Sequence, residues 1–146
     1  MKRGLNFFGQ QPVKNYTLIV GCGSLGAGIA RNLSNQGKDV QILDKNAQSF
    51  RRLSGSYGGL STVADGTDLD ALREANIRSA TTMLAVTDSD STNLMIAQMA
   101  KELFGVPKVV ARVYDTEREA AFRDAGVDTI CPAALSAKEA DKYLEQ

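Results

Sequence analysis

A glycine-rich turn is the first group of residues in this sequence with the types and spacing to hold a ligand. It reads Gly-Cys-Gly-Ser-Leu-Gly over residues 21–26, directly after the apolar run of residues 16–20. The first glycine permits a tight turn, the second lets a pyrophosphate approach the backbone, and the third lets helix and strand pack closely. The start of the following helix then attracts the anion. We therefore expect a dinucleotide-binding turn, to which the Ser24 hydroxyl can add a donor.

Asp44 is the acidic companion that such a turn requires. It follows Gly26 by eighteen residues and ends the second apolar run, where a carboxylate accepts hydrogen bonds from ribose hydroxyls. A carboxylate there repels a ribose 2′-phosphate, which favours NAD(H) or an adenosine nucleotide over NADP(H). The adjacent Lys45 leaves NADP(H) open, because it can pair with that extra phosphate.

Two polar turns and one arginine are further candidates. Residues 65–68 read Asp-Gly-Thr-Asp and residues 86–90 read Val-Thr-Asp-Ser-Asp, each after an apolar run. Ligands of open α/β sheets bind at such carboxyl ends of strands, but ordinary turn and N-cap chemistry also explains these residues. Both interpretations stay open for Asp65 and Thr87. Arg112, late in the fifth run, is either a partner for phosphate or carboxylate or a member of a surface ion pair.

Six short apolar runs, separated by longer amphipathic segments, predict the elements that position these residues. This alternation is typical of βαβ units, and right-handed crossovers place helices on both faces of the sheet. We therefore expect an α/β fold, a Rossmann-like doubly wound parallel sheet of about six strands. The expected strands cover residues 16–20, 39–44, 60–64, 81–86, 108–113 and 127–131.

Helix signals punctuate the connecting segments. Capping-box patterns at 116–119 and 136–139 predict helix starts, and three glycines predict helix ends: Gly37, Gly105 and Gly126. The apolar residues between 90 and 104 cover more than one helical stripe. Core packing and a subunit interface explain that helix equally well.

Composition bounds the function. The 146 residues have 17 basic and 17 acidic side chains and no histidine, which argues against nucleic acid as a partner and excludes histidine-based catalysis. Cys22 and Cys131 form no disulfide framework, so we expect a reducing, cytoplasmic compartment and a structural role for Cys22. No membrane span is expected. Residues 1–15 lack a period and are interpreted as a tail, in which Phe7 and Phe8 can pack on the domain or dock elsewhere.

Several linked segments together resemble the TrkA N-terminal or RCK (regulator of potassium conductance) family. The resemblance spans residues 16–136 and rests on LIVGCGSLGAGIARNL, on ILDKN, on the stretch from VADGTDLDALREANIRSA to VVARVYD, and on FRDAGVDTICP. Its distinctive part combines an Asp-Gly-Thr turn, a helix of Leu-Arg-Glu-Ala type, and a Thr-Asp-x-Asp-x-x-Asn helix start.

The resemblance implies a regulator that is not an enzyme. Such domains bind NAD(H) or adenine nucleotides (ATP, ADP, AMP), form dimers and rings, and attach to the cytoplasmic face of a membrane potassium channel or transporter. Carried over by position, the glycine turn lines the phosphates of the ligand, and the end of the second strand lines its ribose. The end of the third strand lines the adenine side of the ligand, and the end of the fourth strand lines its far side. The family's basic position follows the fifth strand. The corresponding residues are Gly21, Gly23, Ser24, Leu25 and Gly26; Asp44 and Lys45; Asp65, Gly66 and Thr67; Val86 and Thr87; and Arg112.

The chain departs from the family pattern at its end, and two other functions compete. Members usually continue into a small second lobe, so we expect residues 16–146 to form one nucleotide-binding domain whose missing lobe belongs to a complementary regulator chain.

A small NAD-dependent oxidoreductase is the main alternative function, since fold does not settle function. The sequence shows neither the Tyr-x-x-x-Lys pattern nor the substrate domain that such an enzyme uses. A scaffold with a vestigial cleft is the third candidate.

Overall fold

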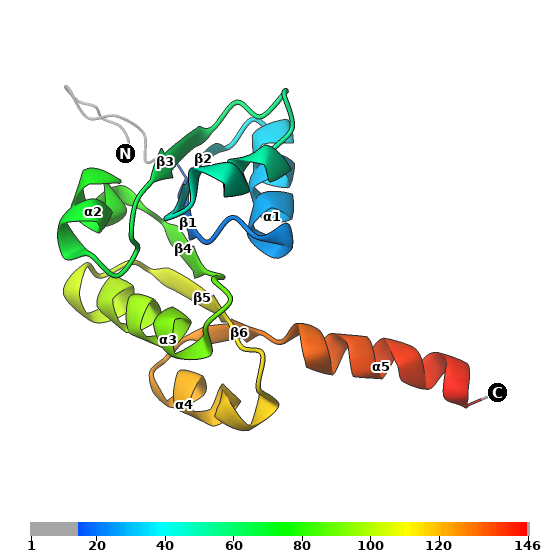
Figure 1. Ribbon diagram of the computed structural model, residues 1–146. Helices are drawn as coiled ribbons and strands as arrows, with labels where there is room; N and C mark the ends of the chain where they lie inside the picture. Colours follow the sequence, from blue (N-terminus) through cyan, green and yellow to red (C-terminus); the bar gives the residue numbers. More distant parts are fainter. Residues whose placement is uncertain (1–14, 146) are drawn as a thin grey trace, which may run out of the picture.

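A six-stranded, all-parallel sheet forms the centre of the computed structural model, which describes residues 15–145 (Figure 1). The order across the sheet is β3-β2-β1-β4-β5-β6, and every neighbouring pair is parallel. The strands are β1 (Tyr16–Val20), β2 (Asp39–Asp44), β3 (Leu60–Val63), β4 (Thr82–Ala85), β5 (Lys108–Arg112) and β6 (Asp128–Ile130). This is the predicted doubly wound fold, with the strand order reversing at β1.

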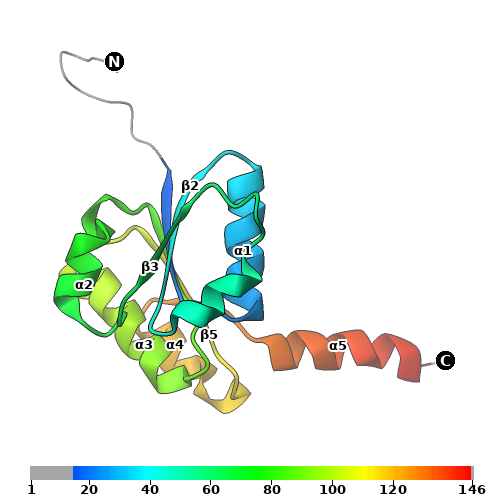
Figure 2. The same cartoon turned by 45° about the horizontal axis from the view of Figure 1, so that its top comes forward.

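Helices cover both faces of the sheet, as Figure 2 shows with the sheet close to edge-on. One face packs against α1 (Ser24–Asn35) and the short η1 (Ala47–Arg52), and the other packs against α2 (Leu69–Glu74), α3 (Asp90–Gln98) and α4 (Glu119–Asp124). Each face has its own buried apolar cluster, because strands buried on both sides carry apolar residues in both directions. The remaining short helices are η2 (Ile77–Ser79), η3 (Met99–Leu103) and η4 (Thr116–Arg118).

The last helix, α5 (Pro132–Leu144), extends away from the domain in both views (Figures 1 and 2). None of its residues is buried, and Leu135, Tyr143 and Leu144 are exposed. Among residues 15–145 no helix has the length and apolar composition that crossing a membrane requires.

The predicted elements agree with the structure except at some ends. Gly37, Gly105 and Gly126 end helical segments with positive φ angles of 74°, 63° and 75°, as predicted. The helix start predicted at Ser136 is wrong, because α5 begins at Pro132, whose fixed φ suits the first helical position. At the other predicted capping box, the side chain of Asp115, one residue earlier, caps the turn by accepting from Glu117 N.

The predicted helix of residues 90–104 is α3 continued by the π-helical η3. Ile96, Ala97 and Ala100 are buried against the sheet, while Met95 and Leu103 are 43% and 54% exposed. Core packing therefore explains one side of this helix, and its use as an interface stays a prediction. The expected tail, with Phe7 and Phe8, lies almost entirely outside the described residues.

Candidate functional site

A cleft of about 650 Å³ opens at the carboxyl ends of the strands, where the strand order reverses. It brings together most of the residues that the sequence singled out, from the turns after β1 to β4 and from the end of β5. The predicted residues that line it are Gly21, Gly23, Asp44, Lys45, Asp65, Gly66, Thr67, Val86, Thr87 and Arg112. Of the other three, Ser24 is exposed, Leu25 packs against the α1-side core and Gly26 is buried; none of them lines the cleft.

The glycine turn packs directly on the end of β4. Gly21 has a φ of +109°, and a Cβ there would lie 2.7 Å from the Val86 carbonyl oxygen. A Cβ on Gly26 would collide with the carbonyl oxygen of Gly21. These two glycines are therefore required by close approach of backbone to backbone.

Gly23 differs from its two neighbours, since a Cβ there would meet no atom within 4 Å. It is the N-cap of α1, it offers no side-chain hydrogen bond to the helix, and the first turn contains no acidic residue. The N–H groups at this helix start carry partial positive charge and lack a side-chain cap. The arrangement suits an anion such as a phosphate.

The carboxylate of Asp44 lies beside the glycine turn and is held by the backbone. Its Oδ2 accepts from Cys22 N at 2.8 Å, and its Oδ1 accepts from Asn46 N at 2.8 Å. Each carboxylate oxygen has a second lone pair. Asp44 can therefore accept from ligand hydroxyls without giving up either backbone bond.

The Asp65–Thr67 turn forms the rim beside β3. Asp65 Oδ1 accepts from Thr67 N at 2.9 Å and from Thr67 Oγ1 at 2.7 Å, and these two bonds hold the pKa of the exposed Asp65 carboxyl below its usual value. Gly66 is buried, and a Cβ there would collide with a methyl group of Val20. Turn chemistry thus explains the local geometry, and the same turn forms part of the cleft wall.

Arg112 reaches the cleft from the end of β5. Its Nη1 donates to the Thr87 carbonyl oxygen at 3.1 Å, and its guanidinium lies 5.4 Å from the centre of the Tyr114 ring. The three ion pairs found within residues 15–145 do not include Arg112. The described part of the chain therefore holds this cation through a carbonyl and an aromatic ring, not through the surface ion pair that the sequence left open.

Arg52 is a cleft residue that sequence reasoning missed. It ends η1, and its Nη1 donates to the carbonyl oxygen of Cys22 at 3.3 Å. Arg31 in turn donates to the carbonyl oxygen of Arg52. The only sequence signal was the Arg51–Arg52 pair shortly after Asp44, which has no fixed place in a nucleotide-binding motif.

Cys22 is a buried packing residue, as predicted. Its side chain is fully buried, and its Sγ lies 3.4 Å from the Ser49 carbonyl oxygen. Burial, and then the charge of Asp44, raise the pKa of the Cys22 thiol, although Arg52 and Arg31 act in the opposite direction. A thiol with a raised pKa is a poor nucleophile.

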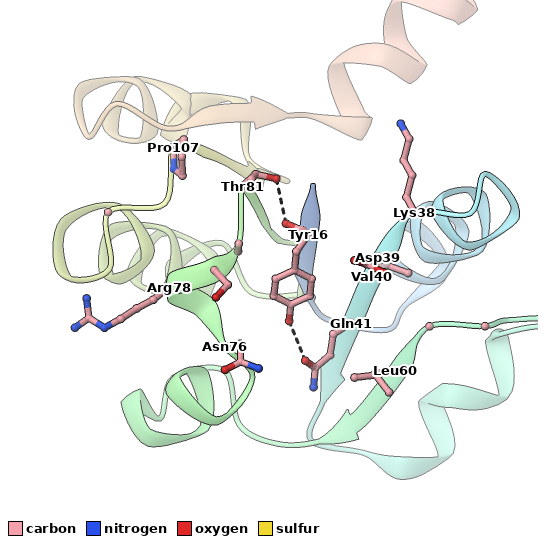
Figure 3. A pocket seen from close by; sticks show the side chains of 15 residues that line it. Tyr16, Lys38, Asp39, Val40, Gln41, Leu60, Asn76, Arg78, Thr81 and Pro107 are labelled. Atoms are coloured by element: carbon pink, nitrogen blue, oxygen red, sulfur yellow. Dashed lines mark hydrogen bonds between the residues drawn. The ribbon is translucent and has the colours of Figure 1, made fainter. Parts of the chain in front are cut away.

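A second, larger hollow of about 940 Å³ lies at the amino ends of the strands (Figure 3). Tyr16 lies at its centre, with its hydroxyl 2.6 Å from the Ala75 carbonyl oxygen and 2.8 Å from Gln41 Oε1. Lys38 and Arg78 flank it on either side. None of the predicted site residues lies in this amino-edge groove.

A doubly wound parallel sheet with a glycine turn and an acidic strand end at its switch point defines a Rossmann-like domain. The TrkA-N domain model matches residues 17–132, and the chain belongs to this family.

Sequence and structure comparisons agree with this assignment. The chain is 38% identical over 124 residues to the Trk system potassium uptake protein TrkA of Streptomyces coelicolor, covering 85% of this chain and 56% of that protein. It is 25% identical to the AMP-bound Kef C-terminal domain of Shewanella denitrificans, with a TM-score of 0.75, over 90% of this chain and 83% of that one. The GsuK channel bound to NAD shares the fold, with a TM-score of 0.69 at 19% identity, over 82% of this chain and 21% of that one.

The chain spans 30–60% of the length of the first relatives that it matches, for example 56% of the Streptomyces protein and 30% of TrkA from Vibrio alginolyticus. The shared part is the domain that contains the cleft.

Proposed function

We propose that the chain is a regulatory nucleotide-binding unit of a membrane potassium transport system, with NAD(H) or an adenine nucleotide (ATP, ADP or AMP) as its ligand. The observation that carries the proposal is that the uncapped α1 helix start at Gly23 and the Asp44 carboxylate line the same cleft. The first recognises phosphate and the second recognises ribose. The relatives support the transport context, since they are potassium uptake proteins.

The cleft supports one orientation of such a ligand. Phosphates lie at Gly21 and Gly23, the ribose next to them lies at Asp44 and Lys45, and the attached adenine lies toward the Asp65–Thr67 turn. Arg112, on the other side of β1, supplies a cation that phosphate can attract away from the Thr87 carbonyl. This assignment retains the roles expected from the family resemblance for the residues that line the cleft, and it gives no role to Ser24, Leu25 and Gly26.

Ligand binding acts on a transporter through the geometry of an assembly. In this proposal residues 16–146 form the domain, residues 1–15 precede it, two copies pair, and pairs join into a ring on the cytoplasmic face of the channel or transporter. A complementary regulator chain supplies the second lobe. A ligand shifts such an assembly only if it binds the two arrangements with different affinity.

The test begins with the full chain as purified. Native mass spectrometry identifies any small molecule that stays bound, and calorimetry then measures the affinity for NADH, NAD⁺, ATP, ADP and AMP in turn. We expect at least one of them to bind with a Kd in the micromolar range or below. Absence of binding by all five at millimolar concentration overturns the proposal, and turnover of NADH with a small substrate would favour the oxidoreductase instead.

A further inference from the structure

Asn93 is a buried polar side chain to which the proposed binding mode assigns no role. It lies in the first turns of α3, is fully buried, and together with Gln41 makes up the buried polar residues of the described chain. All four of its hydrogen-bonding positions are used. Oδ1 accepts from Thr87 N at 2.9 Å and from Thr87 Oγ1 at 2.6 Å, and Nδ2 donates to the carbonyl oxygens of Thr87 at 3.1 Å and Arg112 at 3.0 Å.

These four bonds fix the orientation of the amide. Turning it over would place the NH₂ group against two donors of Thr87 and the oxygen against two carbonyls. Breaking one bond leaves a buried polar group unsatisfied, which costs more than the bond contributes when it is formed. Asn93 therefore holds both of its neighbours in one arrangement.

The position of Asn93 marks where the sheet ends. The β4–β5 ladder runs from Thr82 and Lys108 to Ala85 and Ala111. Beyond the last paired residues of β4 and β5, Asn93 bridges the carbonyl oxygens of Thr87 and Arg112. The same Thr87 peptide lies against Gly21, where a Cβ would be 2.8 Å from Thr87 N. One side chain thus joins the ends of β4 and β5 beside the glycine turn.

The bonds of Asn93 also decide what Thr87 offers to the cleft. The single hydroxyl hydrogen of Thr87 points to Asn93 Oδ1 at 2.6 Å, a much shorter distance than the 3.4 Å to the Ser89 carbonyl oxygen. Ser89 N donates to the Thr87 hydroxyl at 3.3 Å. What remains is an oxygen lone pair, which accepts from a ligand hydroxyl or amide and repels a phosphate.

We propose that Asn93 is a positioning residue of the nucleotide cleft: it fixes Thr87 as a hydrogen-bond acceptor for a hydroxyl or amide group of the ligand and holds the backbone of Arg112 beside it. The inference rests on the proposed function and deepens it. Because Thr87 and Asp44 follow strands on opposite sides of β1, the group that Thr87 accepts from belongs to the second nucleoside of NADH, which ADP lacks.

The test compares Asn93→Leu with a matched control, Gln41→Leu. Both variants replace a buried amide by an apolar side chain of similar size, but Gln41 lies at the amino-edge groove, bonded to Tyr16 and Thr62. Calorimetry with NADH and with ADP is run well below the melting temperature of each full-length variant. We expect Asn93→Leu to weaken the affinity for NADH at least tenfold and the affinity for ADP by no more than threefold. Gln41→Leu should leave both affinities within twofold of the wild-type values.

Thr87→Val supplies an independent measurement if Asn93→Leu does not fold. It removes the oriented hydroxyl and keeps the shape of the side chain, so it should also weaken the affinity for NADH more than the affinity for ADP. Thr87→Ser, which keeps the hydroxyl, should have most of the wild-type affinity for NADH. If the wild type binds none of NADH, NAD⁺, ATP, ADP and AMP, the proposed function fails and the inference with it. If the wild type binds ADP but not NADH, the proposed function stands and the inference is overturned. If the wild type binds NADH and the folded variants bind it within twofold of wild type, the proposed function stands and the positioning role is overturned.

Discussion

The two hollows at opposite edges of one sheet differ in what the backbone presents to them. At the carboxyl edge α1 begins directly after its N-cap Gly23, and Gly23 lines the cleft. At the amino edge helical segments end, at Gly37 after α1 and at Gly105 after η3, so the free backbone groups nearby are carbonyls. The amino-edge groove is the larger of the two. Strand polarity, and not volume, therefore marks the edge that suits a phosphate.

The glycines that end helices at the amino edge differ from the tightly packed glycines near the cleft. A Cβ on Gly21, Gly26 or Gly66 would collide with backbone or core atoms, whereas one on Gly37 or Gly105 would meet nothing within 4 Å. Gly37 and Gly105 are needed only for their positive φ angles. Gly59 is an exception at the amino edge, because a Cβ there would lie 2.7 Å from a methyl group of Val40. Those near the cleft let the turn, the strand end and the helix come together at van der Waals distance.

The largest expected effect comes from breaking this close approach. Gly26→Ala places a methyl group on the carbonyl oxygen of Gly21, and backbone cannot move aside as a flexible side chain can. We expect a loss of about 3 kcal/mol in the free energy of unfolding, the upper part of the usual cost of overpacking. Urea denaturation followed by circular dichroism measures it.

Gly28→Ala is the matched control in the same helix. Its nearest neighbour would be the end of the Arg31 side chain at 3.9 Å, so the substitution should stabilise the protein by about 0.5–1 kcal/mol through helix propensity. Equal effects of the two substitutions would show that the glycine turn is not tightly packed.

Asp44→Ala is expected to have the next largest effect, on ligand affinity. It removes the acceptor of Cys22 N and Asn46 N and the charge that recognises ribose. We expect the binding free energy of NADH or ADP to weaken by about 1–3 kcal/mol, the cost of losing charge-assisted hydrogen bonds. Calorimetry measures the change. Asp39→Ala, at the other end of β2 beside the amino-edge groove, is the control and should bind both ligands as the wild type does.

Gly23→Ser separates ligand binding from folding. A serine at this position has room for its side chain and is a preferred N-cap, so stability should be retained or should rise by up to about 1 kcal/mol. Its hydroxyl then caps the N–H groups that the phosphate would use, and we expect affinity to fall about tenfold, or about 1.4 kcal/mol. Thermal melting and calorimetry on the same sample give both numbers. Unchanged affinity would place the phosphate away from this helix start.

Much of the fold and part of the cleft could be predicted because their signals are local. Six apolar runs, a glycine turn and an acidic strand end can be read directly from the sequence. Arg52 lies in no motif, and Asn93 is noted only as the last residue of the Thr-Asp-x-Asp-x-x-Asn helix start. Their roles could not be predicted, because they arise from contacts with Cys22, Thr87 and Arg112 that form only in the folded chain. The residues of the amino-edge groove carry no motif at all.

Strand and helix ends were less predictable for a related reason. The strand runs were expected to be up to two residues longer than the ladders, since side-chain pattern does not show where a neighbouring strand stops. At the last helix the capping-box pattern at Ser136 competed with Pro132, and the proline determined the start.

The smallest expected effect tests whether the two edges act independently. Burial, with a smaller contribution from Tyr57, raises the pKa of Tyr16 from 10.0 to about 12. The folded protein holds this proton more tightly than the unfolded chain. The contribution of the protonated Tyr16 to the free energy of unfolding is therefore complete below about pH 10 and is lost as the pH rises toward 12. Tyr16→Phe should cost about 1 kcal/mol at neutral pH, from the lost hydrogen bond to Ala75, and should weaken the fall in stability between pH 10 and 12. Some dependence should remain, because burial also raises the pKa of Tyr57 to about 12. Urea denaturation across this pH range tests the expectation, and an unchanged pH profile would contradict it. Calorimetry at neutral pH completes the comparison: NADH affinity should equal that of the wild type, because Tyr16 lines only the groove at the opposite edge.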